Sequence, residues 1–466
     1  MKRKILIGLL SVTCASAAAF GLAACGDGSN SSGNNGDNPK PDAPNYPPPE
    51  DSGNELLKFE LNDYENGYIV TGLADGVTNA SIIIPATYNS LPVVAIGERA
   101  FGSCSTLTSV TISQGISEIG SGAFTGCINI PSFKFPESIT VIGDSAFQNC
   151  TGLKAISFIG TSQLEELSAN TFQGCTNLTS ITVPDSVESI GDRAFQNCTS
   201  IKKAVIGNGV ETIGKETFRG CEKLEQVTIG NSLKTVGEMA FLDCSKISEM
   251  HFPLSLKSVG LGALSGCTGI KSLTIPFVGS EKYSTPLPDP ESEEEYSKNH
   301  TNFGWIFGAN SFSDNYKLKL DNLETVTITG DSPIGFHAFE SIGRFKDASE
   351  TDGIGLKTVI IKGNVKIIGT GAFALCYNLQ TLVLPKSLTT IGNQILDVGV
   401  IKHVYYCGTQ ADWDKIPGVN SSNNHGLFEV NTSGLHFPDP KYYYSESQPA
   451  TEGNFWHYVD GVPTPW

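Results

Sequence analysis

The stretch LTSITVPDSVESIGDRAFQNC, residues 178–198, contains the pattern on which most of the chain is built. Its F-x-x-C ending recurs between residues 96 and 267 at 23-residue intervals, except for one step of 25 from Cys150 to Cys175. A fixed period of this length is typical of a solenoid or a related repeat array. The pattern occurs at Phe101/Cys104, Phe124/Cys127, Phe147/Cys150, Phe172/Cys175, Phe195/Cys198, Phe218/Cys221, Phe241/Cys244 and, with Leu in place of Phe, Leu264/Cys267.

Each unit begins with alternating apolar residues, which predict a short strand with one face inward. In the quoted unit these are Ile181 and Val183, and Pro184 then ends strand pairing because it has no N–H group. The Ile-Gly pair that ends at Gly191 predicts a tight corner. The F-x-x-C segment is expected to form one helical turn with Phe and Cys on the same side.

A single coil of 23 residues cannot bury its apolar side, whereas stacked coils can. Identical residues of stacked coils then form columns about 5 Å apart, the spacing of paired strands. The predicted fold is therefore an α/β solenoid, rich in β-structure. Each coil of about 23 residues combines a short strand, a turn and a single helical turn, and caps close the two ends. We expect the phenylalanine and cysteine columns to lie inside.

These repeats resemble the BspA-like leucine-rich repeat family, whose unit has the form L-x-x-I-x-I-P-x-x-L-x-x-I-G-x-x-A-F-x-x-C. The resemblance extends over about residues 56–420 and is specific for the fold. It is less specific for function, because leucine-rich repeats are recognition scaffolds with many partners. The resemblance implies a bacterial surface protein that acts in adhesion to host or neighbouring cells.

The pattern and the composition divide the chain into seven predicted segments. Residues 26–54 are rich in Gly, Ser, Asn, Asp and Pro and cannot bury enough apolar surface to fold. Residues 282–299 are acidic and interrupt the period. The segments are a signal peptide (1–24), a lipidated disordered tether (25–55), an N-terminal cap (56–95), the leucine-rich repeat array (96–276), an acidic loop excursion (277–322), degenerate continuing repeats (323–399) and a C-terminal cap (400–466).

The N-terminus indicates export. A basic start at residues 2–4 precedes a short apolar run, and the run ends in LAACG at residues 22–26. This ending resembles a bacterial lipoprotein signal, in which cleavage occurs before Cys25 and its sulfur carries diacylglycerol. The alternative is an ordinary secretory signal with a chance cysteine. The prediction is an exported lipoprotein that is anchored to the membrane through the lipid on Cys25 and lies on the cell surface.

The chain has 12 cysteines, and an even number in an exported protein first suggests disulfides. The spacing favours free thiols instead, because a column of equivalent cysteines occupies equivalent buried corners, where Cys behaves as a small hydrophobe. Neighbouring rungs lie within the Cα separation of a disulfide, but parallel side chains seldom reach the required torsion. Metal binding is not predicted, since no C-x-x-C occurs.

Charge and motifs exclude several classes of function. A net charge of −17 argues against nucleic-acid binding, which requires a basic surface. The sequence contains no H-E-x-x-H, G-x-S-x-G, P-loop or dinucleotide-binding motif. We therefore predict a protein that is not an enzyme and that needs no cofactor.

On each strand, the residue between the two inward positions is expected to point outward. These residues are short and mostly carry hydroxyls, so they form a candidate binding face, although Thr also has a high intrinsic strand propensity. The column continues at Thr327, Ile360 and Val383. The candidate face consists of Thr111, Lys134, Ser157, Thr182, Val205, Thr228, His251 and Thr274.

The favoured hypothesis is a cell-surface lipoprotein that presents the solenoid to a protein or glycan ligand on host or neighbouring cells. One alternative is an exported enzyme acting on polysaccharide, with a site between the 277–322 excursion and the C-terminal cap, which would need paired carboxylates at a cleft. Another is a structural spacer. The aromatic residues beyond residue 417 are expected to belong to the cap, or alternatively to form a small recognition patch.

Overall fold

A computed structural model describes residues 54–78, 81–282, 301–345, 353–396, 401–417, 441–446, 455–459 and 462–465. The predicted signal peptide, Cys25 and nearly all of the predicted tether lie outside these ranges. Residues Glu50–Trp466 form one compact unit. The predicted segment limits remain predictions.

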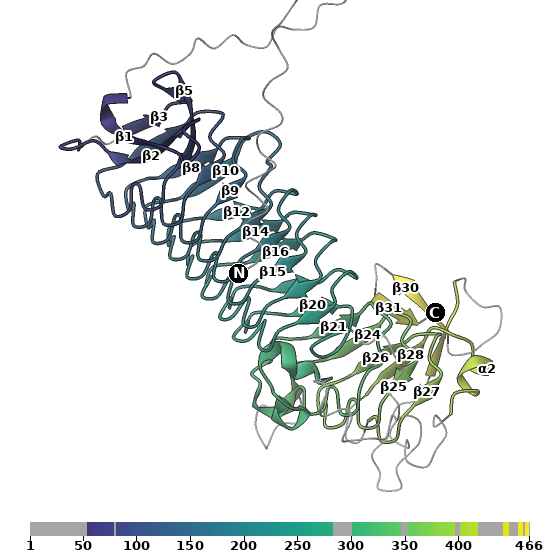
Figure 1. Ribbon diagram of the computed structural model, residues 1–466. Coiled ribbons are helices and arrows are strands. Elements are labelled where there is room, and N and C mark those ends of the chain that lie inside the picture. The colour runs from purple at the N-terminus through teal and green to yellow at the C-terminus, as the bar shows by residue number, and fades with distance from the viewer. Residues whose placement is uncertain are drawn as a thin grey trace, which may run out of the picture. The chain divides into compact units, whose positions relative to one another are not determined.

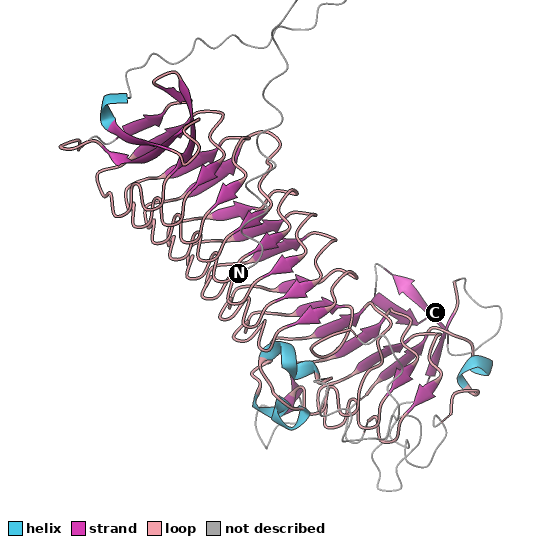
Figure 2. Ribbon diagram, in the orientation of Figure 1, coloured by secondary structure: helices cyan, strands magenta, loops and turns pink. Residues whose placement is uncertain are grey.

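Successive coils stack, and most of their strands of three or four residues pair in parallel with the strand of the next coil, residue by residue (Figures 1 and 2). The strands alternate exposed and buried positions, as at Ser132–Phe135. They are β3 (Ser81–Ile84), β6 (Ser109–Ile112), β8 (Ser132–Phe135), β10 (Ala155–Phe158), β12 (Ser180–Thr182), β14 (Lys203–Ile206), β16 (Gln226–Ile229), β18 (Glu249–His251), β20 (Ser272–Ile275), β21 (Thr325–Ile328), β24 (Thr358–Ile361), β26 (Thr381–Leu384) and β28 (His403–Tyr406).

A second series of parallel strands, most of them two residues long, forms another side of the coils. The apolar core lies between the two series and includes Ile190 and Ile213, which pair with one another. The strands of this series are β5 (Leu91–Ile96), β7 (Glu118–Ile119), β9 (Val141–Ile142), β11 (Glu166–Leu167), β13 (Ser189–Ile190), β15 (Thr212–Ile213), β17 (Thr235–Val236), β19 (Ser258–Val259), β25 (Ile367–Ile368) and β27 (Thr390–Ile391).

The remaining elements lie at the ends of the array and in its insertions. The described residues contain one α-helix, which is four residues long and has a capping box at Thr409. These elements are η2 (Asn54–Leu56), β1 (Leu57–Leu61), β2 (Tyr68–Leu73), β4 (Thr87–Tyr88), the 3₁₀ helices η3 (Phe303–Phe307) and η4 (Phe312–Lys317), β22 (Arg344–Phe345), β23 (Gly353–Ile354), α2 (Gln410–Trp413), β29 (Lys441–Tyr444), β30 (Phe455–Val459) and β31 (Val462–Pro465).

The predicted phenylalanine column is present and continuous. Rings of successive coils from Phe101 to Phe241 are stacked, with centroids 5.2 to 5.4 Å apart. All these rings are buried. Each stacked aromatic pair contributes about 0.5–1.5 kcal/mol beyond the burial of its surface. The column therefore ties the coils from Phe101 to Phe241 to one another through the core.

The predicted helical turn at F-x-x-C is wrong, and so is the description of the fold as α/β. This segment is a run of turns, and the protein is a β-solenoid. On either side of Phe195, Arg193 and Asn197 have left-handed backbone conformations, with φ of 58° and 59°. The N–H of Phe195 is donated to Thr217 O in the next coil, at 2.9 Å. Left-handed residues at these two positions cannot belong to a right-handed helical turn.

The reason for the Ile-Gly pair also differs from the prediction. At Gly214, a Cβ would lie 2.7 Å from the backbone N of Asp192 and 2.8 Å from the carbonyl carbon of Gly191. The N–H of Gly214 is donated to Ile190 O at 2.8 Å. Glycine is therefore required by the close approach of two coils, rather than by a corner that needs unusual backbone angles.

All the described cysteines are free thiols, as predicted. From Cys127 to Cys267, each column cysteine donates its S–H to the carbonyl oxygen of the Phe one coil back, for example Cys221 Sγ to Phe195 O at 3.3 Å. Burial raises the pKa of Cys127 and of Cys267 to about 12. These thiols are therefore packed donors, kept protonated by burial.

Part of the 277–322 excursion packs into the core. Phe303 of η3 is buried and stacks on Phe339 with ring centroids 4.5 Å apart. On the other side of η3, the N–H of Leu264 is donated to Ile306 O at 2.7 Å. The segment thus occupies the place of a coil between Leu264 and Phe339. The acidic residues 283–300 lie outside the described residues.

We expect Gly214→Ala to lower the free energy of unfolding by about 1–3 kcal/mol, the usual cost of overpacking a tight contact. Chemical denaturation followed by circular dichroism measures this change. The matched control is Gly102→Ala, because Gly102 is exposed and a Cβ at this position would have no neighbour nearer than Arg99 O at 3.3 Å. The control should change the free energy by less than about 0.5 kcal/mol. Equal effects of the two substitutions would contradict the steric explanation.

We expect iodoacetamide to modify Cys104 in the native protein much faster than Cys198, because Cys104 is half-buried and Cys198 is fully buried. Buried thiols react slowly, since the thiolate is the reactive form. Peptide mass mapping after timed labelling measures both rates. In guanidinium chloride the two should react alike. Similar native rates would contradict the tight stacking of the coils.

Candidate functional site

The outward side of the four-residue strands, here called the strand face, carries the predicted binding residues. Most of them are exposed, whereas Val205 and Thr274 are half-buried. Strand pairing puts them in register, so that Thr182 lies beside Val205, and Val205 beside Thr228. The exposed residues are Thr111, Lys134, Ser157, Thr182, Thr228 and His251.

Two members of the strand face are engaged with one another. His251 Nδ1 lies 3.1 Å from Thr274 Oγ1, and His251 Nε2 lies 3.7 Å from a carboxylate oxygen of Glu249. By contrast, the hydroxyls of Ser157, Thr182 and Thr228 make no hydrogen bond within the part of the chain that the structure describes. The hydroxyl groups around β10 to β16 are therefore available to a ligand.

A hydrogen bond just beyond the strand extends several of the strand pairs. In these coils the first residue after the strand donates its N–H to the last strand residue of the preceding coil. Examples are Ile159 N to Phe135 O at 2.9 Å and Lys362 N to Ile328 O at 2.8 Å. In both cases the strand pair is complete over four residues.

Proline removes this bond, as the sequence predicts. Pro136, Pro184 and Pro253 occupy the donor position in three coils, and the pairings β6/β8, β10/β12 and β16/β18 are missing. Pro276 and Pro385 occupy it in two other coils, where β18/β20 and β24/β26 pair over three residues instead of four. The strand face is therefore divided into shorter sheets at defined places.

One interruption coincides with the coil of 25 residues. Its two extra residues fall between β10 and β11, in the loop that contains Gly160–Gln163. The second strand series is also broken there, between β9 and β11. In this coil, Ser168 stands in the place of the glycine that follows the short strand elsewhere. Strand pairing with a neighbouring coil is therefore missing on two sides of this coil.

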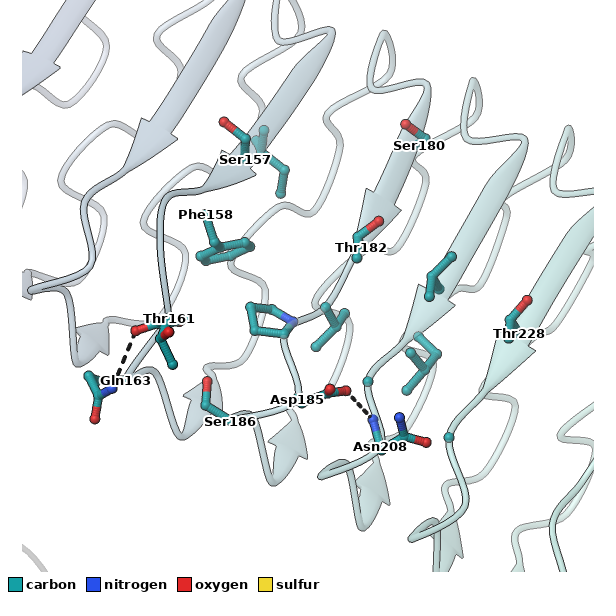
Figure 3. A pocket seen from close by; sticks show the side chains of 18 of the residues that line it. Ser157, Phe158, Thr161, Gln163, Ser180, Thr182, Asp185, Ser186, Asn208 and Thr228 are labelled. Carbon is teal, nitrogen blue, oxygen red and sulfur yellow. Dashed lines mark hydrogen bonds between the residues drawn. The ribbon is translucent and has the colours of Figure 1, made fainter. Parts of the chain in front are cut away.

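A groove of about 960 Å³ opens at this irregular coil and crosses β10, β12, β14 and β16 (Figure 3). It lies at the upper end of the range of roughly 300–1,000 Å³ for ligand sites. Four of the eight predicted face residues line it, namely Ser157, Thr182, Val205 and Thr228.

Polar loop residues form one wall of the groove and hold one another in place. A carboxylate oxygen of Asp185 accepts the backbone N–H of Asn208 at 2.6 Å. Ser186 Oγ donates to Leu164 O at 2.8 Å, and Ser162 Oγ accepts the N–H of Leu164 at 3.2 Å. These bonds connect the loop of the long coil to the next coil, so the wall is ordered before any ligand arrives.

Apolar side chains form the floor. Phe158 stacks on Phe135 with ring centroids 4.9 Å apart, but the corresponding residue of the next coil is Val183. This second aromatic stack therefore ends at the groove. Phe158 and Ile156 occupy inward positions, yet both remain half-exposed. The groove thus combines an aromatic ring, aliphatic surface and neutral hydrogen-bonding groups.

Several residues of the groove carry no recognisable motif in the sequence. Phe158, Gln163, Asp185 and Asn208 line the groove but were not predicted as site residues. The signal that marks them is the single 25-residue step, together with Pro184 in the following coil. Thr111 and Lys134 do not line the groove, although they are exposed on the same face.

Towards the C-terminus the outward column is covered, contrary to the expectation that it stays exposed. Val383 and Tyr405 are 0% and 3% exposed and form a second apolar cluster with Ile360 and Trp456. Trp456 Nε1 donates to Tyr406 O at 3.1 Å. Burial raises the pKa of Tyr405. The described aromatic residues of the C-terminal strands therefore pack against the array.

Three solved structures illustrate what this chain is similar to. A leucine-rich repeat protein from T. pallidum shares 26% identity over 41% of this chain and 88% of that chain, with a TM-score of 0.38. A leucine-rich cell surface protein from Faecalibacterium prausnitzii shares 21% over 79% and 97%, with a TM-score of 0.39. The pneumococcal vaccine antigen PcpA shares 16% over 84% and 93%, with a TM-score of 0.36.

A comparison with curated proteins gives no match. A family model does match, namely that of the BspA type leucine rich repeat region, with six copies. The matched residues are 78–202, 165–282 and 351–405, which together exceed half of the chain. They include the whole groove and the strands that carry it. The chain therefore belongs to the BspA-type leucine-rich repeat family.

Proposed function

We propose that this protein is an exported surface protein whose strand face binds a protein or glycan on host or neighbouring cells. The observation that carries the proposal is the groove on this face, which is lined by hydroxyls without a described partner and by the half-buried ring of Phe158. Solenoids commonly use such extended, preformed surfaces for recognition. Membership of a leucine-rich repeat family supports the same conclusion, and adhesion is the form of binding that we favour.

Binding is favoured over catalysis by the chemistry of the groove. Glycoside hydrolysis ordinarily needs two carboxyl groups that flank the scissile bond. The groove contains one, that of Asp185, and it accepts a backbone N–H. Within the described residues, no group of three or more His, Cys, Asp or Glu side chains is arranged to hold a metal ion. We therefore propose a ligand that is held and released unchanged.

The proposed attachment to the cell rests on the sequence alone. Cys25 in the LAACG stretch would carry diacylglycerol, and residues 26–55 would separate the lipid from the array. Acyl chains contribute about 0.8 kcal/mol per buried CH₂ group, so several chains together give a stable anchor. Among the described residues, no helix has the length and apolar character needed to span a membrane.

The lipid anchor is tested by replacing Cys25 with Ala in a bacterial host that processes lipoproteins. We expect the substitution to abolish incorporation of labelled palmitate and to release the protein from the membrane fraction. Cys14→Ala is the matched control, because Cys14 lies in the predicted signal and should leave incorporation unchanged. Equal labelling of wild type and Cys25→Ala would contradict the proposal.

The binding function is tested by applying the purified full chain to an array of matrix proteins and surface glycans. We expect reversible binding to at least one ligand, weakened at least tenfold by Thr182→Lys combined with Thr228→Lys. The matched control adds two lysines elsewhere, as Ile128→Lys and Val141→Lys, at exposed residues that lie away from the groove. If neither wild type nor control binds any ligand, the proposal fails.

A further inference from the structure

We propose that the groove at the 25-residue coil binds a segment of a neutral glycan. This inference rests on the proposed binding function and deepens it by naming the class of ligand. Three properties of the groove carry it: the small number of charged lining residues, the aromatic floor and the exposed hydroxyl groups.

Charge is nearly absent from the groove, although the chain as a whole carries −17. Of the 20 lining residues, Asp185 alone is charged, and its carboxylate accepts the N–H of Asn208. Among the lining residues an anionic polysaccharide would find no cation, and a basic peptide would find one partly engaged carboxylate. At the rim, Lys203 lies beside Ser180 and the Glu137 carboxylate lies close to Gly160, one charge of each sign. Buried or partly buried charges require partners, so a groove without them favours a neutral ligand.

The aromatic floor suits a sugar ring. Phe158 packs one face of its ring on Phe135, with an angle of 19° between the rings. Because Val183 replaces an aromatic residue in the next coil, the stack does not continue beyond Phe158 (Figure 3). The face of an aromatic ring carries partial negative charge. The polarised C–H groups on the flat side of a pyranose pack against such a face.

The hydroxyl groups suit the sugar's polar edge. Ser157, Ser180, Thr182 and Thr228 are exposed and line the groove. Each hydroxyl can donate one hydrogen bond and accept two, as a sugar hydroxyl can. Paired strands are about 4.8 Å apart, so the hydroxyls of Thr182 and Thr228 lie about 10 Å apart on either side of Val205, along the direction that a polymer crossing the strands would take. The groove volume of about 960 Å³ accommodates more than one sugar unit.

The test is affinity electrophoresis of the folded full chain through gels that contain one soluble polysaccharide each. The neutral probes are an α-glucan, a β-glucan, a mannan and an arabinoxylan, and the anionic probes are polygalacturonate and heparin. We expect retardation by at least one neutral probe and by neither anionic probe. Thr182→Glu should weaken the retarding interaction at least tenfold, because it places a charge in the groove.

Thr111→Glu is the matched control, since Thr111 occupies the same position on β6, is equally exposed and lies outside the groove. It should leave retardation unchanged. Phe158→Leu, which keeps an apolar side chain in the floor, should weaken retardation at least threefold, and thermal melting checks that each variant remains folded. Retention of full affinity by Thr182→Glu would overturn the assignment of the groove.

The outcomes separate this inference from the binding function on which it rests. Binding of array proteins without retardation by any neutral polysaccharide would overturn the glycan assignment and leave the binding function standing. Retardation by the anionic probes alone would also overturn it. Failure of every array ligand and every polysaccharide would overturn both proposals.

Discussion

The close approach of one coil to the next is the constraint on which the structure depends. Coils are joined by backbone hydrogen bonds such as Gly214 N to Ile190 O at 2.8 Å, and at this position no Cβ fits between them. The same distance brings Phe rings into stacking contact at 5.2 to 5.4 Å. It also puts each column thiol within reach of the carbonyl oxygen one coil back. The short distance between neighbouring coils therefore explains why glycine, phenylalanine and cysteine recur in the repeats.

The candidate site lies where the regular pairing between successive coils is interrupted. Proline after a strand removes an N–H that could extend the pairing with the preceding coil, and at Pro136, Pro184 and Pro253 the strand face is interrupted. Where Pro184 coincides with two extra residues in the preceding coil, the inward side chains Ile156 and Phe158 become half-exposed and a groove opens. A repeat protein can thus acquire a distinct site by small changes in one coil while the remaining coils keep the core intact.

The outward residues are mostly exposed in the first half of the array and buried near its C-terminal end. Between β6 and β18 the strand face carries mostly hydroxyl and charged residues and is open, whereas Val383 and Tyr405 are covered by aromatic side chains from the C-terminal strands. The aromatic segment at 303–307 likewise joins the core, because Phe303 continues the stacking towards Phe339. Insertions and C-terminal strands therefore extend the packing of the array, and they confine the accessible face to its earlier coils.

The sequence by itself determined the repeat, the inward columns, the free thiols and the loss of a backbone donor at each proline. These properties follow from a 23-residue period and from the chemistry of single side chains, so they can be deduced without knowing what lies beside them. The turn geometry at Phe195, the groove beside Phe158 and the burial of Val383 were decided by the tertiary structure alone. These features depend on residues in other coils. The backbone N–H of Phe195 is donated to the carbonyl oxygen of Thr217 in the next coil. The side chain of Val383 is buried in a cluster that includes Trp456. A local sequence pattern does not indicate which residues of other coils will lie beside it. Those neighbours are set only when the coils pack together.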